Sequence, residues 1–173
     1  MRSSSWTGFT NIIVTGSTAA FLLHTRSIGV AYFALGAVSC SLTVKILKRL
    51  IRQGRPDPIV RKEKKKSYGM PSTHSATITY FGTYIPLACA FLPIHPSLSY
   101  STFTRLWPPL VVVPCAILIA VSRVWLGHHT WPQVIVGCSY GAAWAFLWFR
   151  IWTHGMSDFG QLVEQEALRY LAS

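Results

Sequence analysis

Four apolar stretches, each about twenty residues long, constrain this chain more than any other feature of its sequence. They cover residues 28–47, 73–92, 108–126 and 132–152. At about 1.5 Å per residue, a helix of this length crosses the roughly 30 Å hydrocarbon core of a bilayer. Residues 9–23 form a weaker apolar stretch, rich in Thr, Gly and Ser. We expect a retained first helix there rather than a cleaved signal peptide.

These stretches predict an all-α fold, a polytopic membrane helical bundle with about five transmembrane helices, or four if the first is not inserted. The composition agrees, because 51% of the side chains are apolar and 12% are charged, whereas about a quarter are charged in a soluble domain. The four cysteines lie singly in apolar stretches, which argues against a disulfide framework or a zinc site. We expect a single domain over residues 1–173, with a core over 45–153 and an interfacial amphipathic helix over 157–173.

The net charge of +11 raises the question of an anionic partner. Basic residues gather between Lys45 and Lys66 and do not alternate with aromatic residues along a helix, so we expect no nucleic-acid partner. The membrane bilayer and the phosphate of a lipid substrate are the partners that this charge matches better. With five helices, the polar loop at 48–70 and the segment 123–131 fall on one membrane face. The connections around Arg26 and Ser97 fall on the other.

Two polar clusters flank the loop on the shared face. Lys48 and Arg55 are seven residues apart, almost two helical turns, so both cations project from one side if the helix persists that far. They are candidates to bracket one phosphate. Ser72 and His74 open the next predicted helix, where free backbone N–H groups and the positive end of the dipole favour an anion. We expect Ser72 to be both the N-cap and a phosphate donor.

A third cluster lies where one apolar stretch ends and the next begins, with Arg123 followed six residues later by His129. An imidazole can take a phosphoryl group only if cations hold the phosphate still and a second proton donor serves the leaving group. The other two clusters supply cations and a second histidine. We therefore interpret His129 as a nucleophile.

Each cluster also has a simpler interpretation. Lys48 and Arg55 alone would be interfacial anchors, Ser72 an ordinary cap, and either histidine a packed or interfacial side chain. The coincidence of all three clusters at helix ends on one face favours a shared phosphate site. His128 beside His129 suggests a metal, but adjacent residues on a helix point about 100° apart and no carboxylate is near. We therefore expect no metal and no cofactor.

Three short patterns resemble the signature motifs of the type 2 phosphatidic acid phosphatase superfamily, membrane lipid phosphatases that share a core with vanadium haloperoxidases. The patterns are Lys48-x6-Arg55-Pro56, Pro71-Ser72-Thr73-His74 and Ser122-Arg123-x5-His129. Two positions depart from the family, since Thr73 stands where Gly is usual and Gln133 where Asp is common. The surroundings of the second and third motifs resemble the dolichyl diphosphate phosphatase branch, in which Gln also stands at the position of Gln133.

The resemblance implies that neutral His129 attacks the terminal phosphorus to form a phosphohistidine, that protonated His74 donates to the leaving oxygen, and that water then cleaves the phosphoenzyme. It also implies that Gln133 orients the nucleophile. The implied phosphate-binding residues are Lys48, Arg55, Ser72 and Arg123. These groups make a divalent metal unnecessary. The mechanism needs His129 neutral and His74 protonated, which implies an activity optimum near neutral pH.

For the whole protein, the resemblance implies hydrolysis of dolichyl (polyprenyl) diphosphate to the monophosphate in the endoplasmic reticulum membrane, which recycles the lipid carrier of protein N-glycosylation. One alternative is a broad lipid phosphate phosphatase acting on phosphatidate, lysophosphatidate or sphingoid phosphates. Another is a non-catalytic membrane binding protein. The orientation is open: the resemblance places the site in the lumen, whereas the positive-inside rule favours the cytosol, because nine cations outside the motifs fall on the motif face and four on the other.

Overall fold

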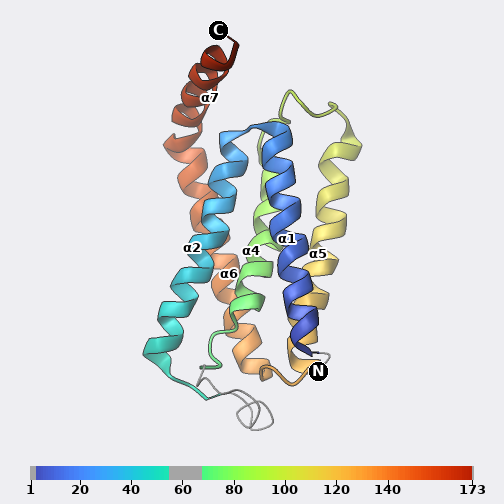
Figure 1. Cartoon of the computed structure of the whole chain (residues 1–173), viewed down its shortest axis with the longest axis vertical. Coiled ribbons are helices and arrows are strands. Elements are labelled where there is room, and N and C mark those ends of the chain that lie inside the picture. Colours follow the sequence, from blue (N-terminus) through green and yellow to red (C-terminus); the bar gives the residue numbers. More distant parts are fainter. Residues whose placement is uncertain (1–2, 55–67, 173) are drawn as a thin grey trace.

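The chain folds as a bundle of long helices, and its computed structural model describes residues 3–54 and 68–172. The helices in chain order are α1 (Ser3–Thr25), α2 (Ile28–Ile51), α4 (Thr73–Phe91), α5 (Thr102–Trp125), α6 (Trp131–Ile151), the π-helical turn η1 (Trp152–Met156) and α7 (Ser157–Ala172). Figure 1 shows α1, α2, α4, α5 and α6 lying side by side, with α7 extending beyond them. No strand occurs in the described residues, which confirms the all-α prediction.

Three described helical stretches are long and apolar enough to cross a membrane, namely α2, α5 and Trp131–Gly160, which begins with α6. Together they confirm a polytopic helical membrane protein. Helix α4 carries a larger share of polar side chains than these three stretches. It contacts α2, α5 and α6, so its polar groups can bond to neighbouring helices. Its Tyr80 hydroxyl, for example, donates to the carbonyl of Phe33 on α2 over 3.0 Å. A membrane crossing by α1 stays a prediction.

Two predicted helix boundaries are wrong. The helix predicted from residue 108 begins six residues earlier, at Thr102, because the side chain of Ser101 caps it by accepting from the backbone N–H of Phe103 at 3.2 Å. Helix α2 runs past the predicted end and stops at Ile51, where Arg52 adopts the left-handed conformation with φ 54°. The α2 helix therefore does not persist through position 54, so the condition on which the shared face of the two cations was predicted is not met.

The ends of the described helices agree with the predicted grouping of the connections, and the membrane faces themselves stay a prediction. The C-terminal ends of α2 and α5 and the first turns of α4 and α6 lie together at one end of the bundle (Figure 1). The connections between α1 and α2 and between α4 and α5 lie at the opposite end. The predicted C-terminal helix is present as α7, and it leaves the bundle after a kink at His154 and Gly155. Its interfacial position stays a prediction.

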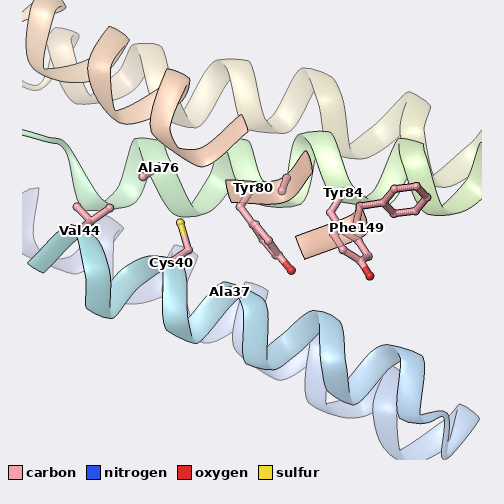
Figure 2. Packing of buried hydrophobic residues seen from close by; sticks show 8 residues of the cluster. Ala37, Cys40, Val44, Ala76, Tyr80, Tyr84 and Phe149 are labelled. Atoms are coloured by element: carbon pink, nitrogen blue, oxygen red, sulfur yellow. The ribbon is translucent and has the colours of Figure 1, made fainter. Parts of the chain in front are cut away.

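A buried cluster joins α2, α4 and α6 (Figure 2). Its members are Ala37, Cys40, Val44, Ala76, Tyr80, Tyr84, Ala145 and Phe149. Small residues of α2 lie opposite the tyrosines of α4, and Tyr84 meets Phe149 edge to face with ring centroids 5.7 Å apart. The alternation of small and aromatic side chains lets the helices interlock without a purely aliphatic core.

Helix α6 approaches α4 at two glycines. A Cβ atom at Gly137 would lie 2.7 Å from the carbonyl oxygen of Ser72, and one at Gly141 would overlap the carbonyl oxygen of Ala76. Small residues four positions apart let two helix backbones come this close. Because Ser72 and Gly137 meet within two turns of the start of each helix, the close approach brings the first turns of α4 and α6 together.

Aromatic residues spaced along α6 fix its register against α2. Trp144 and Trp148 stack with ring centroids 5.8 Å apart, and each indole N–H reaches the α2 backbone. The Trp144 Nε1 donates to the carbonyl of Gly36 at 3.2 Å, and the Trp148 Nε1 donates to that of Tyr32 at 3.0 Å. Such directional bonds in an apolar setting hold α2 at one height, so the last turn of α2 stays level with the start of α6.

Candidate active site

The turn between α5 and α6 carries the candidate nucleophile. Gly127 has φ +69°, a left-handed conformation that reverses the chain after α5. The backbone N–H groups of His128 and His129 then donate back to the carbonyl of Arg123 over 3.0 and 3.2 Å. The two histidines therefore lie in a turn and not on a helix, so the helical angle used to separate them in the sequence does not apply. The turn holds His129 beside the end of α5 that carries Arg123.

Gln133 holds His129 from the first turn of α6. The side-chain oxygen of Gln133 accepts from the Nδ1 of His129 at 3.2 Å and from the backbone N–H of Thr130 at 3.3 Å. An amide oxygen can only accept, so Nδ1 must carry the proton and the Nε2 of His129 keeps its lone pair. The imidazole is 5% exposed and Gln133 is 2% exposed. The tautomer that this pair selects is the one a nucleophile needs.

Ser72 caps α4 as predicted. Its fully buried hydroxyl oxygen accepts from the backbone N–H of Ser75 at 3.4 Å and from the Ser75 hydroxyl at 2.9 Å. With two donors on that oxygen, the proton of the Ser72 hydroxyl is the part left for an anion. The backbone N–H of Ser72 donates to the carbonyl of Gln133 at 3.1 Å, which joins the starts of α4 and α6. His74, half-buried, is the second residue of α4.

Arg123 is a buried cation without a carboxylate partner among the described residues. Its side chain is 3% exposed, and its Nε has no hydrogen-bond partner within that part of the chain. The acidic residues of the described helices all belong to α7, at the opposite end of the bundle (Figure 1). A buried guanidinium is stable only when an anion compensates it, and its planar fork matches phosphate oxygens. This geometry fits a site that receives its negative charge from a ligand.

The first motif is described in part. Lys48 lies half-buried in the last turn of α2, and the chain is described as far as Gly54. Arg55, the second cation of that motif, lies outside the described residues. The structure therefore brings together Lys48, Ser72, His74, Arg123, His129 and Gln133 at one end of the bundle, from four helices.

Two participants were missed in the sequence. The carbonyl of Gly54 accepts from the Nε2 of Gln133 at 3.1 Å, a contact between residues 79 positions apart. Gly69 packs against the same amide so closely that a Cβ there would lie 2.6 Å from the Gln133 nitrogen. A backbone acceptor leaves no mark in a sequence. Gly69 stands two residues before the second motif, and its lack of a side chain is the only local signal of the contact.

The fold and site define a helical membrane protein with a buried arginine and a buried histidine, Arg123 and His129, at one end of its bundle. A sequence profile of the PAP2 superfamily matches residues 29–156. The chain belongs to the PAP2 superfamily, which confirms the resemblance seen in the motifs.

Several relatives are named as phosphatases. The chain is 25% identical to lipid phosphate phosphatase gamma of Arabidopsis thaliana over 95% of its own length and 72% of that protein. It is 32% identical to dolichyldiphosphatase 1 of Homo sapiens, over 60% of its own length and 44% of that protein. The Mus musculus dolichyldiphosphatase 1 is also 32% identical, over 75% of this chain and 53% of that protein. The chain thus spans about half the length of these dolichyldiphosphatases.

A solved structure has the same fold. It is the transmembrane PAP2 type phosphatidylglycerolphosphate phosphatase from Bacillus subtilis, with a TM-score of 0.61 and 24% identity. The match covers 82% of this chain and 67% of that one. At this identity the likeness concerns the arrangement of helices.

The uncompensated charge of Arg123 gives a prediction for Arg123→Met. We expect the ligand-free variant to unfold at the same temperature as the wild type or higher, because a buried charge is removed. Inorganic phosphate at about a hundred times its Kd should raise the wild-type Tm by about 5–10 °C and leave that of the variant unchanged. The measurement is thermal unfolding in detergent, followed by tryptophan fluorescence.

The matched control is Arg150→Met, at an exposed arginine on the last turn of α6, at the opposite end of the bundle. It should keep the full stabilisation by phosphate. Undiminished stabilisation of Arg123→Met would show that this guanidinium does not bind the anion.

Proposed function

We propose that this chain is an integral membrane lipid phosphatase that hydrolyses dolichyl (polyprenyl) diphosphate to the monophosphate through a phosphohistidine. One observation carries the proposal: a buried imidazole, held by Gln133 so that Nε2 keeps its lone pair, lies on a turn bonded to the carbonyl of an uncompensated buried arginine. A site that only bound phosphate would need the cation and not the fixed nucleophile. We propose that residues 1–173 act as one domain.

The proposed reaction has two steps. In the first, the Nε2 lone pair of His129 attacks the terminal phosphorus in line, the bond to the bridging oxygen breaks, and His74 donates a proton to that oxygen. In the second, water attacks the phosphohistidine and gives its proton to His74, which releases inorganic phosphate and restores His129. The leaving group is a phosphate monoester, a better leaving group than an alkoxide.

The cations hold the phosphoryl oxygens in both steps. Arg123 and the Ser72 hydroxyl come from α5 and the start of α4, and the first motif adds Lys48 and Arg55. Positive groups fixed before the reaction stabilise the charge that develops on the oxygens, because they need no reorganisation in the transition state. In this proposal they take the role that divalent metals have in other phosphoryl transfers.

A cavity beside the site supports a lipid substrate. It has a volume of about 420 Å³ and lies between α4, α5 and α6, lined by apolar and small residues that include Thr83, Val113, Val121 and Trp131. On α5 the lining runs from Val113 to Val121, about 12 Å along the helix axis. Val121 lies two residues before Arg123, and Trp131 lies two residues after His129. A lipid chain bound in the cavity would therefore begin next to the residues that bind the phosphate.

The identity of the lipid rests on two observations. Dolichyldiphosphatases are among the relatives at 32% identity, and Gln133 matches the residue that the resemblance described above implies for the dolichyl diphosphate phosphatase branch. The broad alternative, a phosphatase for phosphatidate, lysophosphatidate and sphingoid phosphates, draws support from the match to lipid phosphate phosphatase gamma over most of both chains. The non-catalytic alternative gives no reason for a histidine with a selected tautomer.

A substrate panel on purified protein in detergent, with chelator present, tests this choice. We expect kcat/KM for dolichyl diphosphate to exceed that for phosphatidate or sphingoid phosphate by about tenfold or more, with short prenyl diphosphates between them. The folded His129→Gln protein should hydrolyse none of them. Faster hydrolysis of phosphatidate would support the broad phosphatase, and loss of activity with chelator would contradict the metal-free mechanism.

The assignment of His74 as the acid gives a prediction about leaving groups. His74→Gln should lose about a hundredfold or more in kcat on dolichyl diphosphate, because the bridging oxygen then departs unprotonated. A nitrophenyl phosphate departs as a stable phenolate and needs no acid, so His74→Gln should slow its release in a single turnover far less. His129→Gln should lose both reactions. An equal loss on both substrates would mean that His74 does not act as the acid.

We propose that the protein lies in the endoplasmic reticulum membrane with its site in the lumen, as the resemblance of its motifs implies, against the charge bias of the connections. Single cysteines replacing exposed Gln53 and exposed Ser99, at opposite ends of the bundle, test this in a background without native cysteines. In sealed microsomes, an impermeant thiol reagent should label the Ser99→Cys protein at once and the Gln53→Cys protein only after permeabilisation. The reverse pattern would place the site in the cytosol.

A further inference from the structure

Gln133 touches all three segments that carry the motifs. Its side-chain oxygen accepts from His129 at 3.2 Å, and its side-chain nitrogen donates to the carbonyl of Gly54 at 3.1 Å. Its backbone carbonyl accepts from the N–H of Ser72 at 3.1 Å. The side chain is 2% exposed.

The two ends of the amide are not interchangeable. The partners of the oxygen include the N–H of Thr130, which can only donate, and the partner of the nitrogen is the carbonyl of Gly54, which can only accept. These two contacts independently fix the orientation of the amide. A carboxylate at this position could hold His129 but would face the Gly54 carbonyl with an acceptor. An amide is therefore the chemical group that both partners require.

Gly69 supports the same conclusion from the packing. An added Cβ there would lie 2.6 Å from the nitrogen of the Gln133 amide and 2.9 Å from its oxygen. The segment that leads into α4 thus closes over the amide and leaves it no second position. Because Gln133 is confined on this side and bonded at both ends, a displacement at Gly54 is transmitted to His129.

We infer that Gln133 is a positioning residue whose amide couples the phosphate-binding end of α2 to the nucleophile: its oxygen holds His129 in the attacking tautomer while its nitrogen holds the backbone of Gly54, which follows the helix end that carries Lys48. This inference rests on the proposed function and extends it, because an orienting group alone would act on the nucleophile only. With Gln at this position, one side chain serves both phosphate binding and the orientation of His129, whereas a carboxylate would serve only the orientation.

Gln133→Glu separates the two ends of the amide. The variant keeps an acceptor for His129 and loses the donor to Gly54, at nearly unchanged volume. Losing a buried hydrogen bond and opposing two acceptors should raise KM for the lipid diphosphate by about tenfold or more. A carboxylate beside His129 also favours the protonated imidazole, so the acid limb of kcat/KM should move to higher pH by about one unit or more.

Gly69→Ala displaces the amide without adding charge. We expect it to raise KM as Gln133→Glu does and to leave the acid limb of the pH profile at its wild-type position. Gln53→Glu is the charge control, since its side chain is exposed and outside these contacts, and both KM and the pH profile should stay at wild-type values. Thermal unfolding of each variant establishes that it is folded under the assay conditions.

Wild-type KM together with a wild-type acid limb in Gln133→Glu would overturn the inference and leave the phosphatase assignment standing. A uniform fall in kcat with both quantities unchanged would also overturn it, because the role would then be structural only. If the wild type hydrolysed no lipid phosphate, the proposed function would fail. The inference would then be judged by inorganic phosphate, whose stabilisation of the fold should be weaker in Gln133→Glu than in the wild type, and equal stabilisation would overturn it.

Discussion

The close approach of α6 to α4 is the constraint on which the rest of the structure depends. Gly137 and Gly141 remove the side chains that would separate the two backbones, and the first turns of both helices then lie against each other. The bond from the Ser72 N–H to the Gln133 carbonyl exists only at this spacing. The cap of one helix and the nucleophile before the other are thereby held within one site by the packing of the two helices.

The site keeps a buried positive charge that the described protein does not neutralise. Burial of the Arg123 guanidinium opposes folding in this state, because no described carboxylate compensates its charge. The same imbalance makes an arriving phosphate group favourable, since the anion supplies the missing partner in a setting of low dielectric constant. The unfavourable free energy of burying Arg123 is thus relieved when the phosphate binds, which strengthens binding. Local destabilisation of this kind is common at functional sites.

Much of this arrangement was predictable. The apolar stretches gave the helices of the bundle, the count of spans placed the motifs at one end, and the serine of the second motif was correctly expected to cap α4. The predicted helix boundaries were wrong where a single residue caps the helix. Ser101 starts α5 ahead of its prolines, and Arg52 ends α2 before the second cation of the first motif, because caps of single residues outweigh the apolar pattern nearby.

The sequence by itself determined the membrane class, the helical architecture and the types of side chain at the site, because length, hydropathy and motif spacing are properties of the linear chain. Only the tertiary structure decided which atoms meet. The amide of Gln133 gained its second partner from the Gly54 carbonyl, far away in the chain, and His129 gained its tautomer from that amide. Such contacts depend on the distance between helices, and the packing of glycines and aromatic rings sets that distance only once the bundle has formed.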